Sequence, residues 1–461
     1  MTTDDSRGGL TMNTGRAEGA RGPGRRGTLR WSRGRVVSAL LAAVVATAGC
    51  DVTNPGNILD ENLNREDAFQ ALVNGMAGDF SLGLNGANSG AVRFAVLFGE
   101  IWAGTSGEAD LFAARGILPA DRPDYNNWTN NAHAARWVAE DGIRRMRETG
   151  GAVESSALMA EARLWAGFSN RLLGDIHCEA VFDNGPAMPR SAYYERAEEH
   201  FTEAIGVGMS AGASDLTYAG YGGRASVRLI LGDLSGAVAD ARQVPTDFAW
   251  YAEFNDVAQG GRQTNAVWHE THPRRNVTVG LTWFRDYYVE TGDPRVPSQD
   301  ANRAGGDGIS PLVSVEKYPD GTSDVPLTKG SEMRLIEAEA LIRGGQWQQG
   351  LDMINAMRAE IGVPAWEAMS TEGAFEALIL ERAIVMWLEA RRGGEFYRLN
   401  QLSQFFPGGY TPADDTIIQQ MIDNVKATLP AVMADAVLRQ NRATCWGFSE
   451  VMRATNPNLG G

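Results

Sequence analysis

Residues 332–362, EMRLIEAEALIRGGQWQQGLDMINAMRAEIG, constrain the fold of this chain more than any other stretch. Their second half presents one apolar stripe at helical spacing, formed by Trp347, Leu351, Ile354, Met357 and Ile361. Gly362 then supplies a left-handed stop, and Pro364 prevents the helix from continuing. The first half buries a matching stripe of Met333, Ile336 and Ala340. The stretch therefore predicts two helices packed around a short glycine turn.

Similar helical pairs are predicted elsewhere in the chain. Residues 154–175 with 193–205 form one pair, residues 225–244 form another, and residues 378–392 end a fourth copy. Small and large apolar residues alternating around a glycine turn resemble the tetratricopeptide pattern. A segment rich in Trp, Tyr, Pro and Gly, about 245–330, separates the second copy from the third. We expect a mainly α fold of tetratricopeptide-like helical repeats with a large irregular, loop-rich insertion there.

The amino-terminal segment has the order of an export signal. Arginines precede an apolar run from Val36 to Ala46, which ends in small residues and Cys50. The run is shorter than the ~20 residues that a membrane-spanning helix needs. Its TAGC ending resembles the bacterial lipobox, in which the cysteine is acylated after cleavage. We predict a lipoprotein signal peptide at 1–49, lipidation of Cys50 and a lipid-anchored tether at 50–56, with an ordinary cleaved signal or an uncleaved anchor as the alternatives.

The charge of the remaining chain excludes one class of partner. The first 49 residues carry eight arginines against three acids, so their removal changes the net charge from −15 to −20. A nucleic-acid-binding face needs clustered Lys and Arg, and three lysines occur in the whole sequence. We expect no nucleic-acid partner. The remaining length suits one large helical domain or two fused lobes, and we expect a single α-helical domain at 57–461.

Two cysteines remain besides Cys50, namely Cys178 and Cys445. An exported protein reaches an oxidising compartment, where a disulfide is permitted. The sequence does not show whether the two Cα atoms come close enough for a bridge. A possible disulfide and two buried free thiols stay open as alternatives.

Residues 78–131 are rich in Gly, Asn and Asp, which predicts loops broken by a short helix near 94–102. Aromatic rings and planar polar side chains in such loops suit sugar recognition, because rings pack on C–H faces while amides and carboxylates bind hydroxyls. The candidate ligand-binding residues here are Trp102, Asp124, Tyr125, Asn126, Asn127 and Trp128. The competing interpretation is that these aromatic rings anchor the loops to the core.

A second aromatic cluster lies in LTWFRDYYVE, within the insertion. Trp283 and Tyr287 are four residues apart, so both rings fall on one helical face as candidate ligand-binding residues. An ordinary packed stripe that includes Leu281, Phe284 and Tyr288 explains the same spacing.

No motif for metal or covalent chemistry stands out. In WHETHP, His269 and His272 are three residues apart, whereas a helical metalloprotease needs a spacing of four with a Glu between. His177 and Cys178 are direct neighbours, which rarely face each other as base and nucleophile. We therefore expect no catalytic residue, no metal site and no cofactor.

Several strings, in order along the chain, resemble the SusD/RagB family of nutrient-binding outer-membrane lipoproteins. They are residues 161–189, the TGDPRV element at 291–296, residues 332–362, and residues 378–399. Residues 332–362 match best, through Arg-Leu-x-Glu-Ala-Glu-Ala and Ile-Asn-x-x-Arg. The chain departs from the family at Ala390, where Gly is usual, and at Arg398, near a common Asp.

The resemblance implies a protein that binds nutrients without transforming them. Family members sit at the cell surface, anchored by lipid in the outer membrane, and deliver oligosaccharide or another nutrient to a TonB-dependent, SusC-like transporter. The family's best-known member binds its glycan through the broad amino-terminal loop region. The competing hypothesis is a tetratricopeptide-type scaffold on the envelope, whose helical repeats bind a partner polypeptide.

Overall fold

The structure, a computed structural model, describes residues 60–85, 90–103, 112–255, 263–431 and 442–459. The predicted signal peptide, Cys50 and the tether lie outside these residues. Residues Leu59–Gly461 form one compact unit. Within the described ranges, no helix has both the length and the apolar character that a bilayer crossing requires.

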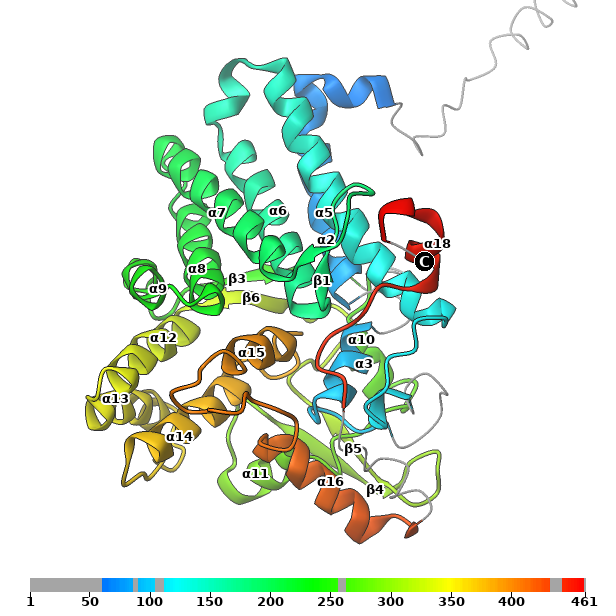
Figure 1. Cartoon of the computed structure of the whole chain (residues 1–461), viewed down its shortest axis with the longest axis vertical. Helices are drawn as coiled ribbons and strands as arrows, with labels where there is room; N and C mark the ends of the chain where they lie inside the picture. Colours follow the sequence, from blue (N-terminus) through cyan, green and yellow to red (C-terminus); the bar gives the residue numbers. More distant parts are fainter. Residues whose placement is uncertain (1–59, 86–89, 104–111, 256–262, 432–441, 460–461) are drawn as a thin grey trace, which may run out of the picture. The chain divides into compact units, whose positions relative to one another are not determined.

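Helices dominate this unit, which confirms the predicted fold class (Figure 1). The α-helices are α2 (Phe69–Asn85), α3 (Gly90–Leu97), α5 (Pro123–Thr149), α6 (Ala157–Ile176), α7 (Ser191–Ala211), α8 (Ser214–Leu231), α9 (Leu234–Ala241), α10 (Ala266–Thr271), α11 (Trp283–Thr291), α12 (Gly330–Arg343), α13 (Trp347–Glu360), α14 (Thr371–Val385), α15 (Arg392–Leu399), α16 (Thr416–Thr428) and α18 (Glu450–Thr455). Short 3-10 turns are η1 (Asp60–Asn64), η2 (Glu66–Ala68), η3 (Gly151–Ser155) and η4 (Pro457–Leu459).

The predicted helical repeats form a continuous row. Helix α6 packs on α7, α7 on α8, and α8 on α9, while α12 packs on both α9 and α13. Figure 1 shows α7, α8, α9, α12 and α13 following one another along one side. Helices α12 and α13 are the pair predicted from residues 332–362. The row therefore continues from α9 to α12 although the insertion separates them in sequence.

Close helix packing in the first repeat depends on small residues. The Phe201 ring of α7 lies between Gly167 of α6 and Gly223 of α8. A Cβ atom at Gly167 would come within 2.6 Å of this ring, and one at Gly223 within 2.5 Å. The predicted alternation of small and large residues thus brings three helices together around one aromatic side chain.

The insertion is more ordered than the sequence indicates. Its strands are β3 (Ala249–Ala252), β4 (Ser298–Ala304), β5 (Pro311–Val315) and β6 (Val325–Lys329), while β1 (Glu179–Ala180) and β2 (Met188–Pro189) form a separate short pair. Strand β3 at the start of the insertion pairs antiparallel with β6 at its end, and β4 pairs with β5. The β3–β6 pair returns the chain to the point where the repeats resume.

The prediction of loops across 78–131 is wrong for much of that segment. Helix α2 continues through Asn85, and α5 already begins at Pro123, where proline suits the first helical turn because it has no amide hydrogen to leave unbonded. The short helix expected near 94–102 is present as α3, a few residues earlier. The Gly and Asn content misled the prediction because packing of buried side chains overrides weak helix propensity.

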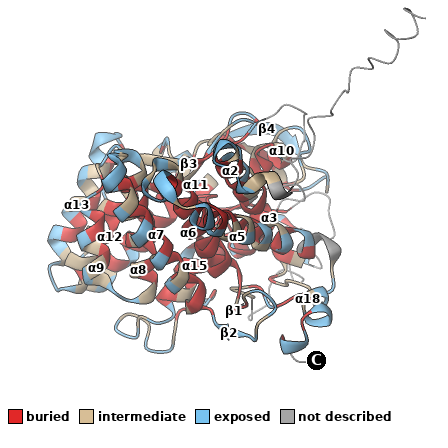
Figure 2. Ribbon diagram, turned by 90° about the horizontal axis from the view of Figure 1, so that it is seen from above, coloured by how far each residue is buried: buried red, intermediate tan, exposed pale blue. Residues whose placement is uncertain are grey.

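The core runs through the middle of the helices. In Figure 2 the buried residues are concentrated in the middle of the unit, on α5, α6 and α7, and the outer turns of α9 and α13 are among its exposed parts. Helix α6 is buried almost from end to end, from Met159 to Ile176. This central helix positions the residues of the candidate site that follows.

A disulfide joins Cys178, just after α6, to Cys445 in the carboxyl-terminal segment. Of the two alternatives for these cysteines, the structure has the bridge, with the two Cα atoms 5.0 Å apart. Backbone hydrogen bonds lie on both sides of it: the amide of Cys178 donates to the carbonyl of Trp446, and the amide of Trp446 donates to that of Ile176. The bridge therefore holds the end of the chain against the central helix.

Replacing both bridge cysteines, Cys178→Ala with Cys445→Ala, is expected to lower the free energy of unfolding by about 3–5 kcal/mol. The reason is that the bridge closes a loop of 267 residues and so restricts the unfolded chain. Denaturant titration of the oxidised protein and the double variant measures the difference. A matched control is the unchanged protein under reducing conditions, which should lose a similar amount. Equal stability of all three samples would contradict the prediction.

Candidate functional site

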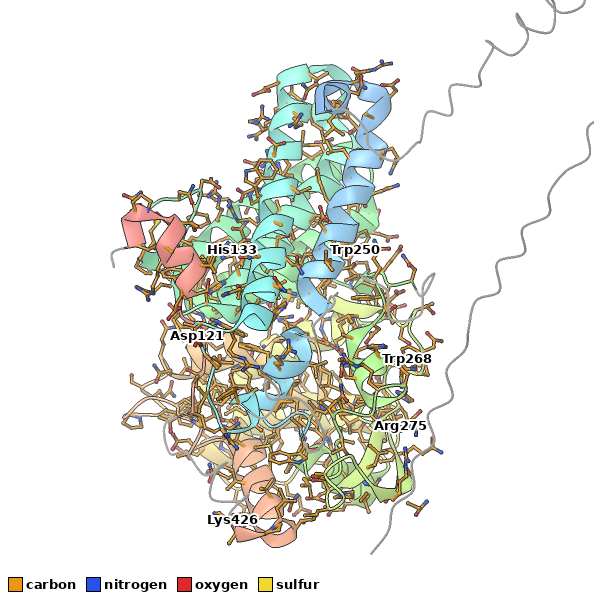
Figure 3. All side chains as sticks on the ribbon, turned by 90° about the vertical axis from the view of Figure 1, so that its right-hand side faces the viewer. Asp121, His133, Trp250, Trp268, Arg275 and Lys426 are labelled. Atoms are coloured by element: carbon orange, nitrogen blue, oxygen red, sulfur yellow. A yellow bond between two sulfur atoms is a disulfide. The ribbon has the colours of Figure 1, made fainter. Side chains whose placement is uncertain are left out.

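A groove of about 650 Å³ lies between α2, α6 and β3. Its walls combine aromatic rings with amides and carboxylates, and we call it the α2–α6–β3 groove. Figure 3 shows one of the rings, Trp250, beside α2. Helix α2 contributes Asn74, Gly78 and Ser81, while β3 and the residues after it contribute the segment 249–255.

Trp165, Trp250 and Tyr251 form the aromatic wall of the groove. The ring centroids of Trp165 and Trp250 are 6.3 Å apart and the planes are inclined by 46°. Behind them, Phe80 of α2 packs against Trp165 at 5.6 Å. Tyr251 is 44% exposed, so its ring is available at the edge of the groove. Two of the three rings are therefore supported from behind by the core.

The pairing of β3 with β6 sets the direction of two of these rings. The register shifts between Trp250 and Tyr251: Trp250 lies opposite Thr328, and Tyr251 lies opposite Pro326. Such a bulge increases the local twist and redirects side chains, and Pro326 is tolerated there because a bulge requires no ladder hydrogen bond from its nitrogen. As a result, two successive aromatic residues of one strand both line the groove.

Three carboxylates face the same space, from Glu161, Glu253 and Asp324. The indole nitrogen of Trp165 donates to Oε1 of Glu161 at 3.3 Å, and the amide of Phe254 donates to Oδ1 of Asp324 at 2.9 Å. Burial raises the pKa of Glu161, and the negative charge of Glu253 raises it further, although the Trp165 hydrogen bond acts in the opposite direction. The groove is thus polar and negatively charged along one side.

Amide groups complete the polar lining. Gln70 donates to Oδ1 of Asn74 at 3.0 Å, which orients the Asn74 amide. The backbone amide of Asn255 donates to the carbonyl of Gln263 at 3.0 Å, and the Asn255 side chain donates to the Gln263 side chain. A Cβ at Gly78 would lie 3.1 Å from Nε2 of Gln263, so the absence of a side chain on α2 lets Gln263 approach the helix.

One buried polar atom of the groove lacks a hydrogen bond in the described part of the structure. The indole nitrogen Nε1 of Trp250 has no hydrogen-bond acceptor among the described residues. A buried donor without a partner carries a desolvation cost, which an acceptor oxygen on a ligand removes. A hydroxyl, ether or carbonyl oxygen of a ligand that reaches this nitrogen would satisfy it.

The structure places the predicted loop aromatics Trp102 and Trp128 in the core instead of in this groove. Nε1 of Trp102 donates to Oγ of Ser310 at 3.3 Å, and the Trp102 backbone forms a bridge with Thr278. Nε1 of Trp128 donates to the carbonyl of Gly83 at 3.0 Å. Their polar and apolar surfaces are therefore already engaged by the protein, as the competing interpretation holds.

The polar neighbours of Trp128 lie on a helix and not on a loop. Asp124, Tyr125, Asn126 and Asn127 all belong to α5. Asn126 is buried and Asn127 is exposed, while the side chains of Asp124 and Tyr125 lie outside the described residues. The lining of the α2–α6–β3 groove includes none of the predicted ligand residues among the positions described.

Trp283 and Tyr287 form part of an aromatic stack on the insertion. Their rings are stacked with centroids 4.8 Å apart, and Tyr287 stacks in turn on Trp366 at 6.0 Å. The Tyr287 hydroxyl donates to Asp293 at 2.9 Å. These contacts correspond to the packed stripe that competed with the ligand-binding interpretation.

None of the three rings of this wall, Trp165, Trp250 and Tyr251, is among the ligand-binding candidates predicted from the sequence. A signal was present in AWYAEFN, residues 249–255, where aromatic residues alternate with an acid and an amide. The string comes directly after a predicted helical pair, at the start of the insertion. Its meaning depends on the pairing of β3 with β6, which joins residues about 75 positions apart.

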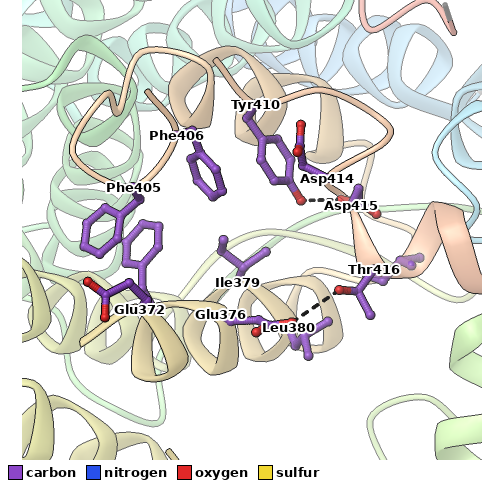
Figure 4. A pocket seen from close by; sticks show the side chains of 12 residues that line it. Glu372, Glu376, Ile379, Leu380, Phe405, Phe406, Tyr410, Asp414, Asp415 and Thr416 are labelled. Carbon is purple, nitrogen blue, oxygen red and sulfur yellow. Dashed lines mark hydrogen bonds between the residues drawn. The ribbon is translucent and has the colours of Figure 1, made fainter. Parts of the chain in front are cut away.

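A second cavity, of about 310 Å³, lies between α14 and the segment before α16 (Figure 4). Phe375 and Phe405 stack on each other at 3.8 Å, and the Tyr410 hydroxyl donates to Asp415 at 2.8 Å. Asp415 also pairs with Arg392 and caps α16. Because these rings and this carboxylate already serve the fold, we place the candidate site in the α2–α6–β3 groove.

The residues of the WHETHP string and Cys178 make structural contacts. Glu270 accepts hydrogen bonds from Arg274 and Asn276, and His272 stacks on Trp268 at 6.1 Å. Within the described ranges, no three His, Cys, Asp or Glu residues are grouped so that they could hold a metal ion. Cys178 is in the disulfide and is therefore no free thiol.

Comparisons with known proteins identify the fold. No protein-family model matches the sequence, and the curated proteins contain no match to it. A SusD superfamily protein from Parabacteroides distasonis has 14% identity and a TM-score of 0.60, over 86% of this chain and 98% of that one. A SusD superfamily protein from Bacteroides vulgatus has 14% identity and a TM-score of 0.59, over 86% and 98%.

A third similar structure is a SusD-like carbohydrate binding protein from Bacteroides fragilis, with 11% identity and a TM-score of 0.59 over 86% of this chain and 99% of that one. At such identities the likeness shows the fold. The chain therefore has a SusD-like fold across most of its length, and the resemblance to the SusD/RagB family is confirmed at that level.

Because the Trp128 ring fills the core, Trp128→Ala is expected to lower the free energy of unfolding by about 3–5 kcal/mol. Trp137→Ala is the matched control, since Trp137 lies on the same helix and is 54% exposed. Denaturant titration of both variants measures the difference. If Trp128→Ala is no more destabilising than Trp137→Ala, Trp128 is not a core residue and its predicted ligand role gains support.

Proposed function

We propose that this protein binds a saccharide in the α2–α6–β3 groove as a nutrient and does not transform it. The observation that carries the proposal is that the aromatic wall of Trp165, Trp250 and Tyr251 lines one cavity together with amides and carboxylates. Sugar rings pack their C–H faces on aromatic rings, while planar amides and carboxylates bind pairs of hydroxyl groups. The unbonded Nε1 of Trp250 adds a donor for a sugar oxygen.

The size and structure of the groove agree with such a ligand. Its volume of about 650 Å³ falls within the ~300–1,000 Å³ range of small-molecule sites. The similar structure from Bacteroides fragilis is named as a carbohydrate binding protein, which supports the same ligand class. Trp250 belongs to a paired strand, so little ordering of the main chain is needed when the ligand binds.

We propose that the protein acts at the cell surface, anchored to the outer membrane through lipid on Cys50. The lipobox-like TAGC ending and the apolar run before it support the anchor. The SusD-like fold supports a SusC-like, TonB-dependent transporter as the partner that receives the saccharide. Proximity to a transporter raises the local ligand concentration, so modest affinity is sufficient.

The central test removes the exposed side of the aromatic wall. Trp250→Ala and Tyr251→Ala are each expected to weaken binding of a saccharide ligand about tenfold, because each removes a stacking surface. Affinity electrophoresis on a panel of soluble polysaccharides, followed by calorimetry on the retained one, measures the loss. Trp137→Ala, outside the groove, is the control and should bind as the unchanged protein does. Equal retention of all variants would move the site away from the groove.

The same samples test whether binding occurs without cleavage. Two carboxylates in one groove, Glu161 and Glu253, are the residue types that glycoside hydrolases use. We expect no release of reducing ends when the pure protein is incubated with the retained saccharide. Release that disappears in Glu161→Gln would identify the protein as a hydrolase instead.

The anchor has its own test. Native protein from an envelope fraction is expected to carry acyl chains on the amino-terminal residue Cys50, and Cys50→Ala should release the protein into the soluble fraction. Mass spectrometry of the amino-terminal peptide measures the acylation. An unacylated terminus that begins at another residue would favour an ordinary cleaved signal.

A further inference from the structure

The charged side chains among the described lining residues of the α2–α6–β3 groove are all negative. Its described lining contains the carboxylates of Glu161, Glu253 and Asp324 and includes no Lys, Arg or His. Within the described part of the chain, no Arg or Lys pairs with any of the three in a salt bridge.

Several carboxylates elsewhere in the protein are paired with basic side chains. Near α6 and α7, for example, Glu203 pairs with Arg147 at 3.0 Å and with Arg163 at 2.6 Å in a smaller cavity. The sequence has 42 basic residues in total, so counter-charges are available to the fold. The groove carboxylates therefore keep their charge available to whatever occupies the groove.

Two features of the groove favour a positively charged group on the ligand. Carboxylates in a partly enclosed space attract a cation and repel an anion, and the attraction is stronger there than in open water. Ammonium groups also interact favourably with the faces of Trp and Tyr, and such rings line the same groove. The negative charges of Glu161 and Glu253 repel each other within the groove, and a bound cation relieves that repulsion.

We propose that the groove selects saccharides that carry protonated amino groups, such as glucosamine oligomers, and rejects saccharides that carry uronic acids. This inference rests on the proposed saccharide-binding function and narrows it to one ligand class. The aromatic wall holds the sugar rings, and Glu161, Glu253 and Asp324 receive the ammonium groups. A uronate places a negative charge against these carboxylates and is excluded.

The test compares hexasaccharides of one length by calorimetry, under conditions in which the amine is protonated. The probes are β-1,4-linked glucosamine, N-acetylglucosamine and glucose hexamers, and a galacturonic acid hexamer. The glucosamine hexamer is expected to bind about tenfold more tightly than the N-acetylated hexamer. Three weak ion pairs, one to the partly buried Glu161 and two to the exposed Glu253 and Asp324, together provide a gain of that size. The galacturonate should not bind measurably, and the preference for the amine should weaken as salt is added.

The combined variant Glu161→Gln, Glu253→Gln, Asp324→Asn removes the charges and keeps the shapes. Each amide retains an oxygen, so the hydrogen bonds from Trp165 and from the Phe254 amide are preserved. In this variant the affinity ratio of the glucosamine to the N-acetylglucosamine hexamer is expected to fall to within about twofold of unity. Glu290→Gln on α11, an exposed carboxylate outside the groove, is the matched control and should keep the full ratio.

Each outcome has one meaning. If the galacturonate binds as tightly as the glucosamine hexamer, or if the combined variant keeps the full ratio, the inference is overturned while saccharide binding stands. If the unchanged protein binds none of these hexamers but retains another saccharide, the ligand class is wrong and the proposed function survives. If no saccharide of any kind is retained, both fall. Circular dichroism of the variants verifies that each one is folded.

Discussion

Ion pairs buried inside the unit hold the two halves of the helical row together. Arg391 lies beside the start of α15 and contacts Glu332 of α12 at 3.0 Å and Asp175 of α6 at 3.7 Å. Although burial alone would raise the pKa of Glu332, Arg391 and neighbouring arginines hold it below its usual range. Buried charges are costly unless each one is paired, so this geometry permits little sliding of α12 against α6. Arg398, near the position of a common Asp in the family, contributes in the same way by pairing with Glu339 and Glu395.

The same kind of interaction fixes the strand that supports the groove. Glu389 pairs with Lys329 at the end of β6 and with Lys317 just after β5, so two of the four strands of the insertion are tied to the segment after α14. The backbone around Glu389 is unusual, because Leu388 and Ala390 both have positive φ, at 60° and 58°. L-residues reach that conformation at a cost, which the surrounding pairing has to offset. Ala390 is the position where the family more often has Gly, so the departure seen in the sequence coincides with local backbone strain.

The parts of the fold that are encoded locally were predictable, and the parts that depend on distant partners were not. The α12–α13 pair follows from an apolar stripe and a glycine turn within 31 residues. The burial of Glu332 does not follow from its neighbours, since its partner Arg391 is 59 residues away. Trp128 was expected on a loop because Pro, Asn and Asp surround it in the sequence. Trp128 instead packs against α2, and the residues around it belong to helix α5. The groove needs α2, α6 and β3 together, and no single segment reveals it.

The position of the groove follows from how the insertion joins the repeats. Because β3 pairs with β6, the two ends of the insertion meet beside α8 and α12, and the rings that follow α9 are directed toward α2 and α6. A ring on a paired strand loses less freedom on binding than a ring on an open loop, so the same contact surface yields more affinity. Trp102 and Trp128, which were expected on loops, are instead buried in the core. The candidate groove therefore lies where two ordered parts of the chain meet, and Trp102 and Trp128, which precede β3 in sequence, stabilise the core.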